Sequence, residues 1–229
     1  PKFIRRNFFN RQIHNTVYVT ANPHVSLLNG DEFYKTITDP IDQWDANIGC
    51  VRPRSVTQAA KKAHEVYTDK RIIVHYMQPH DPPLGPAAEQ LREEYEICGP
   101  VPGKEAPDGD RIMKLVANGT IATDRARTAY KESIKIVLEE VRTLLNNVSG
   151  KVVISADHGE HFGEKPYPLI GKLYEHYRNP RTVELCKVPW FTVDTGVGRR
   201  EIKPEEPSEV VTPVPKETVE EQLDSLGYL

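Results

Sequence analysis

A long amphipathic helix that runs directly into a short β-branched strand is the feature that most constrains this fold. Between residues 124 and 150, apolar side chains recur at the i, i+3, i+4 and i+7 spacing of one helical stripe. The residues on this stripe are Tyr130, Ile134, Val137, Leu138, Val141, Leu144 and Leu145. The segment KVVIS at residues 151–155 then has the pattern of a buried strand. Because a helix that leads into a strand is half of a crossover, we expect an α/β domain with a largely parallel sheet, covered by helices on both faces.

Other parts of the chain fit the same architecture. The segments with strand or helix patterns are residues 16–20, 71–77 and 188–193 for strands, and residues 3–9, 55–67 and 87–97 for helices. Ser55 has the residue type of an N-cap and is expected to begin its helix. Residues 31–53 follow no regular pattern, and no element is assigned to them.

The composition is typical of a soluble domain and not of a nucleic-acid-binding or membrane-spanning protein. The chain has 229 residues, of which 38% are hydrophobic, and a formal net charge of −3. A negative net charge argues against nucleic acid as the main partner. The apolar runs are far shorter than the roughly 20 residues that span a bilayer, so no membrane span is expected. Cys50, Cys98 and Cys186 are widely spaced and are expected to be buried thiols.

The composition changes after residue 200. Residues 201–229 contain four prolines, eight acidic residues and two basic residues. We therefore expect an α/β domain at residues 1–200, followed at residues 201–229 by an acidic, proline-rich tail that is extended up to a short terminal helix near Val219. Deletion of this tail is expected to leave the fold intact.

Polar and ionisable side chains follow the strand at residues 151–155. Asp157, His158, Glu160 and His161 lie within five residues of one another, and ligands of α/β proteins bind beyond the carboxyl ends of strands. Carboxylate oxygens and imidazole nitrogens are ligands for Mg²⁺, Ca²⁺, Mn²⁺ or Zn²⁺. Gly159 is expected to permit the tight turn that aims Asp157 and His158 at one ion. The alternative is a polar strand-to-helix turn with Asp157 as an N-cap and solvated histidines.

A second strand end carries two more histidines. His75 lies in the strand at residues 71–77, and His80 follows in the loop QPHDPPLG, whose three prolines restrict the backbone. A histidine of this kind is often a structural residue. Since both loops follow strands of an expected parallel sheet, we predict that His80, Asp157 and His158 face one cleft.

The segments HYMQPHDPP, SADHGEHFGE and LDSLGYL, in this order, resemble the sulfatase family of the alkaline-phosphatase-like superfamily. The resemblance covers about residues 71–229. The amino-terminal segments PKFIRRNFF and VTANPHV are similar to the archaeal sulfatase-like branch. The resemblance implies an alkaline-phosphatase/sulfatase-like fold and a metal-dependent hydrolase of sulfate or phosphate esters. Its implied partner is a small anionic ester, sulfated or phosphorylated, including such esters of glycans.

The resemblance also implies roles for individual residues. Asp157 and His158 match a pair of ligands for a divalent metal ion, which is Ca²⁺, Mg²⁺, Mn²⁺ or Zn²⁺. His80 matches the histidine that contacts the transferred sulfuryl or phosphoryl group. A cation and these donors would stabilise the charge that develops on the ester oxygens.

Further downstream, the resemblance implies a lysine clamp and a third histidine. Lys172 or Lys165 matches the lysine that holds the transferred group, with Lys172 in a catalytic role and Lys165 in substrate binding. His176, in the sequence YEH, is a metal ligand or the acid that protonates the leaving group. His75 is expected to contact the substrate.

One part of the family pattern is missing. The family places its nucleophile and its first acidic metal ligands just after the first strand, and no such segment precedes Phe3. Cys50 in GCVRPRS is superficially similar to the Cys-x-Pro-x-Arg signature, but the proline comes one place late and no strand with paired Asp precedes it. We therefore expect the fold to be incomplete at the amino terminus. The alternatives are a non-catalytic binding module of the same fold and an enzyme similar to phosphoglycerol transferases.

Overall fold

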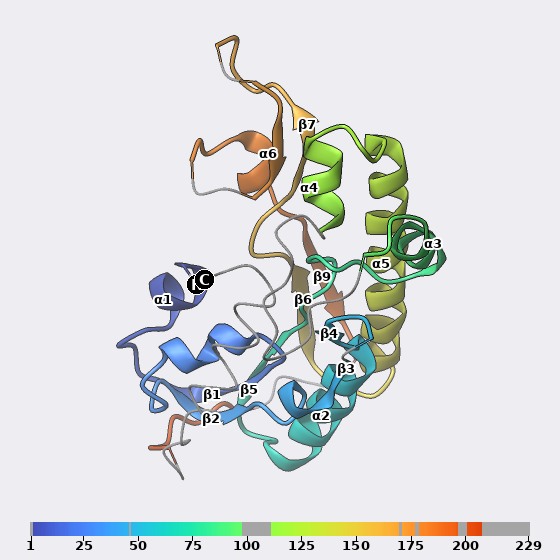
Figure 1. The fold of residues 1–229 in the computed structure, drawn as a ribbon. Coiled ribbons are helices and arrows are strands. Elements are labelled where there is room, and N and C mark those ends of the chain that lie inside the picture. Colours follow the sequence, from blue (N-terminus) through green and yellow to red (C-terminus); the bar gives the residue numbers. More distant parts are fainter. Residues whose placement is uncertain are drawn as a thin grey trace.

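The centre of the fold is a small parallel sheet. The computed structural model describes residues 2–45, 47–97, 111–169, 171–176, 179–196 and 201–207. β1 (Ile13–Thr20) lies between β2 (Phe33–Ile37) and β5 (Arg71–His75), and both neighbours run parallel to it (Figure 1). The predicted α/β character is confirmed.

One face of β1 packs against two helices. Val17 and Val19 point to this face and have no exposed surface. They share a core with residues of α2 (Pro53–Val66) and with the carboxyl-terminal end of α5 (Thr123–Leu145). The stripe predicted on residues 124–150 therefore supplies part of this core through its last turns.

The other face of β1 is covered by the amino-terminal region. Successive strand residues point to opposite faces, so Tyr18 lies opposite its two valine neighbours. It packs in a core with residues of α1 (Lys2–Asn7) and of the short 3₁₀ helix η1 (Pro23–Leu27). Helices thus cover both faces of the three-stranded sheet, as a parallel sheet requires.

The start of α2 differs from the prediction. Pro53 occupies the first turn of the helix, where a missing backbone N–H leaves no hydrogen bond unmade. Arg52 is the N-cap, and Ser55 lies inside the helix. The prediction that the helix begins at Ser55 is therefore wrong, because the ring of Pro53, two residues earlier, already fixes a helical backbone angle.

A second core lies beside the sheet (Figure 1). It is built from α3 (Pro86–Glu94), α4 (Ile112–Ala117), the first half of α5, and the hairpin of β7 (His161–Glu164) and β8 (Leu173–Glu175). Ala126 and Ala129 of α5 belong to this core, whereas Leu144 of the same helix belongs to the core under the sheet. One long helix therefore joins the two cores.

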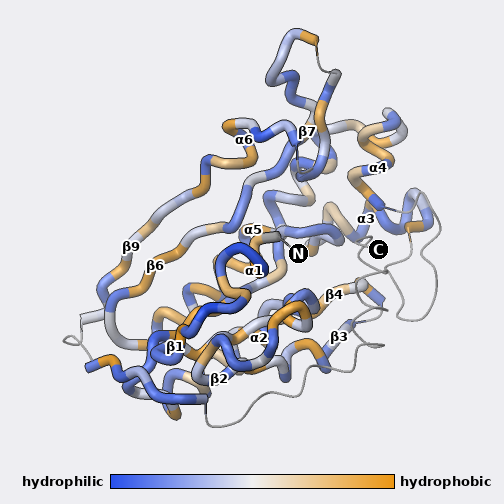
Figure 2. The backbone as a smooth tube through the Cα atoms, turned by 90° about the vertical axis from the view of Figure 1, so that its left-hand side faces the viewer, coloured by the Kyte–Doolittle hydropathy of each residue, from blue (hydrophilic) through white to orange (hydrophobic). Residues whose placement is uncertain are grey.

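The strand after α5 does not join the parallel sheet. β6 (Lys151–Ser155) pairs antiparallel with β9 (Trp190–Asp194), and in the described part of the chain it pairs with no other strand. We expected the helix before β6 to lead it into one largely parallel sheet, and this expectation is wrong for β6. The strand that it pairs with, at residues 190–194, comes later in the chain and runs antiparallel to it. Figure 2 shows this two-stranded ribbon at one side of the molecule, with hydrophobic stretches in both strands. Val153 and Trp190 are 41% and 74% exposed.

Residues 31–53, which carried no assigned element, contain several short ones. Besides β2, they form the 3₁₀ helix η2 (Ile41–Gln43) and the two-residue strands β3 (Trp44–Asp45) and β4 (Cys50–Val51), which pair with each other. Elements this short have too few residues for a recognisable period.

We expected buried cysteines, and of the two that the structure describes one is buried and one is exposed. Cys50 is buried, but Cys186 is exposed because it ends α6 (Val183–Cys186), a surface helix in which only Leu185 is buried. Cys98 lies outside the described residues. In the described part of the chain, no helix is long and apolar enough to cross a membrane.

The first residues of the acidic tail are anchored to the sheet. Residues 201–207 form no helix or strand, but the backbone N–H of Glu205 donates to the carbonyl of His14, at 3.2 Å. The Glu205 carboxylate lies 2.8 Å from Nζ of Lys70, a side chain with only 1% exposure that also pairs with Asp69 at 3.0 Å. Burial alone would lower the pKa of Lys70, but these two carboxylates raise it. The terminal helix expected near Val219 lies outside the described residues.

Replacement of Glu205 should therefore destabilise the protein. In Glu205→Gln the buried Lys70 ammonium loses a carboxylate that pairs with it at 2.8 Å, and we expect the free energy of unfolding to fall by about 1–2 kcal/mol. Urea unfolding measures this change. The matched control is Glu206→Gln, whose 88% exposed carboxylate pairs with His14 at 3.5 Å and should contribute little. Equal stability of the two variants would contradict the anchoring role of Glu205.

Candidate functional site

The loop that follows β5 holds His80 in a defined orientation. Nδ1 of His80 donates to the carbonyl of Asp81, at 2.7 Å. Two side chains tether the loop: the amide of Gln78 donates to the carbonyl of Val51 at 2.8 Å, and Arg92 donates to the carbonyl of Pro83 at 2.9 Å. Hydrogen bonds at Gln78 and at Pro83 therefore hold the loop on either side of the His80 imidazole.

The loop that follows β6 is pressed against α6. The backbone N–H of Gly159 donates to the carbonyl of Leu185 at 3.0 Å, and a Cβ at position 159 would overlap the carbonyl oxygen of Glu184. Gly159 has no positive φ. The glycine is therefore needed for close approach to α6 and not, as predicted, for a tight turn.

His158 on this loop is oriented like His80. Its Nδ1 donates to the carbonyl of Gly159 at 2.8 Å, and its Nε2 lies 3.8 Å from a carboxylate oxygen of Asp157. The side chains of His158 and Asp157 are 37% and 31% exposed, so both are accessible to a ligand.

His176, which follows β8, joins the two loops. Its ring stacks on His158 with centroids 4.3 Å apart, and its centroid lies 5.3 Å from that of His80. Nδ1 of His176 donates to the carboxylate of Glu160, at 3.0 Å from Oε2. Residues that lie far apart in the sequence therefore form one group, which we call the histidine cluster: His80, His158 and His176.

The three rings of the histidine cluster share one arrangement. In each, Nδ1 carries a proton that is donated to a backbone carbonyl or a carboxylate. Nε2 is then the ring atom with which a neutral histidine accepts a hydrogen bond or a metal ion. Glu175, just before His176, has a φ of 60°, which is uncommon for a residue other than glycine and often marks functional sites.

The pKa values of two of these histidines move in opposite directions. Burial acts to lower the pKa of His176, but the hydrogen bond and the charge of Glu160 outweigh it, and the pKa is raised. Burial, with the positive charge of His176 nearby, lowers the pKa of His80 to about 4. A histidine with a raised pKa thus lies beside one with a lowered pKa, which is the pattern of an acid and base pair.

Asp81 is a member of the site that sequence reasoning missed. Burial raises the pKa of its carboxyl to about 7, and the charges of Glu160 and Glu175 act in the same direction, whereas Arg111 opposes them. Arg111 also lies close enough for its charge to affect His80. The position of Asp81 directly after His80, beyond a strand end, was the available signal.

Two further histidines lie within electrostatic reach of the cluster. Nδ1 of His75 is 2.7 Å from the hydroxyl of Tyr18, and burial lowers the pKa of His75. His24, 3% exposed, follows β1 as His80 follows β5, and burial lowers its pKa to about 3. The charges of His75 and His80 contribute to that shift. His24 was not predicted, although its place just after a strand is the same signal that identified His80.

The remaining predicted residues lie elsewhere. Lys165 and Lys172 are exposed in the segment that joins β7 to β8, which projects at the top of Figure 1. Within the described residues, neither lysine makes a hydrogen bond or ion pair with the histidine cluster. Cys50 is buried, and burial raises the pKa of its thiol to about 11, so it is a poor nucleophile.

Asp157 and His158 have the donor chemistry of metal ligands but lack a third partner. In the part of the chain that the structure describes, no three His, Cys, Asp or Glu side chains are placed to hold one metal ion together. The described residues therefore offer two protein ligands, and a bound cation would need water or substrate oxygens to complete its coordination.

Comparison with known proteins identifies no relative. No family model matches the chain, and neither the curated proteins nor the solved structures contain a significant match.

The raised pKa of Asp81 predicts a specific pH dependence of stability. Because the folded state holds this proton more tightly than the unfolded chain, stability should fall as the pH rises from about 4 to 7. Asp81→Asn removes that loss, so the variant should gain stability relative to wild type between pH 4 and pH 8. The upper bound of this gain is about 4 kcal/mol, at about 1.4 kcal/mol per pKa unit.

Chemical denaturation at several pH values checks this expectation. Asp42→Asn, at an exposed carboxylate of η2, is the control and should run parallel to wild type. A pH profile of Asp81→Asn that also runs parallel to wild type would show that Asp81 is an ordinary carboxylate.

Proposed function

We propose that this chain carries part of an active site that cleaves sulfate or phosphate esters, as the resemblance to the sulfatase family implies. The observation that supports it most is the meeting of His80 and His158, from the loops after two different strands, at His176. Two histidines that served only as local structural residues would have no reason to converge on a third that is paired with a carboxylate.

The paired pKa shifts supply a division of roles. In the proposed reaction, protonated His176 donates the proton on Nε2 to the oxygen of the leaving alcohol. Neutral His80 accepts a proton at Nε2 from the attacking group. The resemblance implies that His80 contacts the transferred group. In this proposal it accepts a proton instead, because its Nδ1 proton is already engaged by the carbonyl of Asp81.

Both cationic groups and the carboxylates of Glu160, Glu175 and Asp157 lie near the cluster, and the cationic groups are the ones that an anionic substrate would contact. His176 and Arg111 both lie within electrostatic reach of His80. In this proposal they take the part that the resemblance assigns to Lys165 or Lys172. Selection between sulfate and phosphate is left open, because both are tetrahedral anions with similar hydrogen-bonding geometry.

A divalent cation is part of the proposal, with Asp157 and His158 as its protein ligands. Mg²⁺ commonly keeps several waters and binds through few protein groups together with substrate oxygens. When bound, the cation would neutralise charge on the ester. Ca²⁺, Mn²⁺ and Zn²⁺ are compatible with the same pair of donors.

The nucleophile is proposed to come from outside the described residues. Cys50 is buried as a thiol, and the edge of β5 that faces away from β1 has no strand partner in the described part of the chain. A strand added there in parallel would bring its carboxyl end to the histidine cluster, because parallel strands end at the same edge of a sheet. This would complete the sulfatase-like sheet. The alternative, a non-catalytic binding module, is favoured by the absence of a third metal ligand among the described residues.

Anion binding tests the cluster without requiring turnover. In His176→Gln we expect the affinity for inorganic phosphate or sulfate to fall about tenfold, because a hydrogen bond to a charged group contributes about 1.5–3 kcal/mol. In the wild type, affinity should weaken as the pH rises through the raised pKa of His176, since the cation is lost. Calorimetry or NMR titration measures both effects.

The lysines provide matched controls for that titration. Lys165→Ala and Lys172→Ala remove exposed positive charges outside the cluster and should change anion affinity by less than about twofold. If a lysine variant lost anion binding while His176→Gln kept it, that lysine would hold the anion, as the resemblance implies.

A measurement of ester hydrolysis distinguishes an enzyme from a non-catalytic binding module. We expect the 229-residue chain to show no meaningful hydrolysis of aryl sulfates or phosphates with Ca²⁺, Mg²⁺, Mn²⁺ or Zn²⁺, because we identify no activated nucleophile among the residues that the structure describes. A chain extended upstream should be active, and Asp157→Ala should abolish that activity. Robust Asp157-dependent turnover by the 229-residue chain would contradict the external nucleophile. Inactivity of the extended chain with every ester and metal would favour the binding module.

A further inference from the structure

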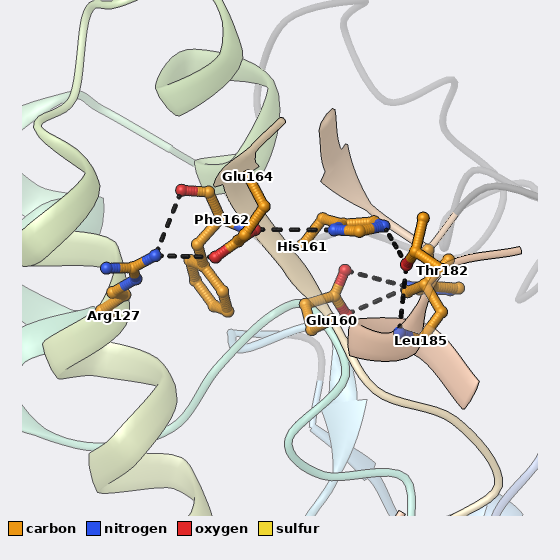
Figure 3. A network of polar contacts seen from close by, with 8 residues as sticks. Arg127, Glu160, His161, Phe162, Glu164, Thr182 and Leu185 are labelled. Atoms are coloured by element: carbon orange, nitrogen blue, oxygen red, sulfur yellow. Dashed lines mark hydrogen bonds and ion pairs between the residues drawn. The ribbon is translucent and has the colours of Figure 1, made fainter. Parts of the chain in front are cut away.

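A chain of polar contacts, buried at its centre, runs from Arg127 to Leu185 (Figure 3). His161, the first residue of β7, is 1% exposed, and its Nε2 lies 2.9 Å from the hydroxyl of Thr182. Its Nδ1 lies 3.5 Å from the carboxylate of Glu164. The other oxygen of that carboxylate pairs with Arg127 of α5 at 2.8 Å.

The contact between His161 and Glu164 is electrostatic, because Nδ1 of His161 is buried and makes no hydrogen bond within the described residues. Burial acts to raise the pKa of Glu164, but the backbone N–H of Phe162 and the guanidinium of Arg127 outweigh it, and the pKa is lowered. An ionised carboxylate attracts an imidazole N–H and repels its lone pair, which favours the tautomer with Nδ1–H toward Glu164. In that tautomer Nε2 accepts from the Thr182 hydroxyl at 2.9 Å.

The same chain ends on the helix that supports the loop after β6. Thr182 is the N-cap of α6, and its hydroxyl oxygen accepts from the N–H of Leu185 at 3.4 Å. The carbonyl of Leu185 in turn accepts from Gly159. Arg127 on α5 and Gly159 in the loop are therefore linked through one run of contacts.

A single peptide bond connects this chain of contacts to the histidine cluster, because Glu160 directly precedes His161. Glu160 is 11% exposed, and its carboxylate accepts a hydrogen bond from Nδ1 of His176. A rotation of the backbone at residue 161 would move the Glu160 carboxylate away from that ring.

We propose that His161 and Thr182 are positioning residues, which hold Glu160 in place so that it orients the ring of His176. This inference rests on the proposed function, since it assigns His176 a role in binding or protonating a substrate. The buried Thr182 hydroxyl and the buried His161 imidazole would thus support the site without contacting the substrate.

A hydroxyl, an imidazole and a carboxylate in series also resemble a nucleophile with its base. Thr182 is only 5% exposed, and its hydroxyl caps α6. A buried hydroxyl that serves as a helix cap cannot reach an ester in solvent. The contacts therefore serve to position other groups and not to attack the substrate.

Thr182→Val tests the proposal, because valine keeps the shape of threonine and removes only the hydroxyl. The readout is the NMR signal of the Nδ1 proton of His176, which the hydrogen bond to Glu160 protects from exchange, assigned by its loss in His176→Gln. We expect the signal to disappear or move in Thr182→Val and to return in Thr182→Ser. Phosphate affinity should fall about tenfold in the valine variant, as is typical when a supporting contact is lost, and recover in the serine variant.

The control is Thr128→Val, which removes an exposed α5 hydroxyl that donates to the carbonyl of Asp124. It should leave the His176 signal unchanged. If Thr182→Val does not fold, Arg127→Gln decides the question from the far end of the chain, where Arg127 is 42% exposed. A smaller shift of the same signal is expected there.

An unchanged His176 signal in Thr182→Val, or in Arg127→Gln where the valine variant does not fold, would overturn the positioning role. The signal is measured without substrate. If the wild type binds no phosphate, the proposed function fails while the His176 signal still decides whether Thr182 and His161 position the ring.

Discussion

The burial of β1 on both faces is the constraint on which the rest of the structure depends. Val17, Tyr18 and Val19 have no exposed surface, which is possible only when helices cover both sides of the sheet. α2 and the end of α5 cover one face, and α1 with η1 covers the other. Because β5 is bonded to β1 in parallel, their carboxyl ends lie together and carry His24, His75 and His80 to the same edge.

The histidine cluster depends on contacts that come from outside that sheet. β6 is not bonded to β5, yet its loop reaches the same place because α6 supports Gly159 and the β7–β8 hairpin carries His176. The protonation of the cluster follows from this arrangement. Glu160 raises the pKa of His176, whereas burial and the neighbouring His176 lower the pKa of His80.

Local patterns in the sequence were sufficient for most helices and strands and for the two loops that carry histidines. Helical spacing identified α5, and β-branched runs identified β1, β5 and β6. Polar residues directly beyond strand ends marked His80, Asp157 and His158. The same rule, applied to every strand end, would also have marked His24 and Asp81. Lys165 and Lys172 were assigned by resemblance alone, and the structure leaves both exposed in the β7–β8 connection.

The sequence by itself determined which segments are helical or extended, because the spacing of apolar side chains along one segment is a local property. Only the tertiary structure decided that β6 pairs with β9, that Gly159 is needed against α6, and that Cys186 is exposed. These features depend on contacts between residues far apart in the chain, for which no local pattern exists. The pKa shifts of Asp81, His80 and His176 belong to the same class, since burial and neighbouring charges arise only when separate loops meet.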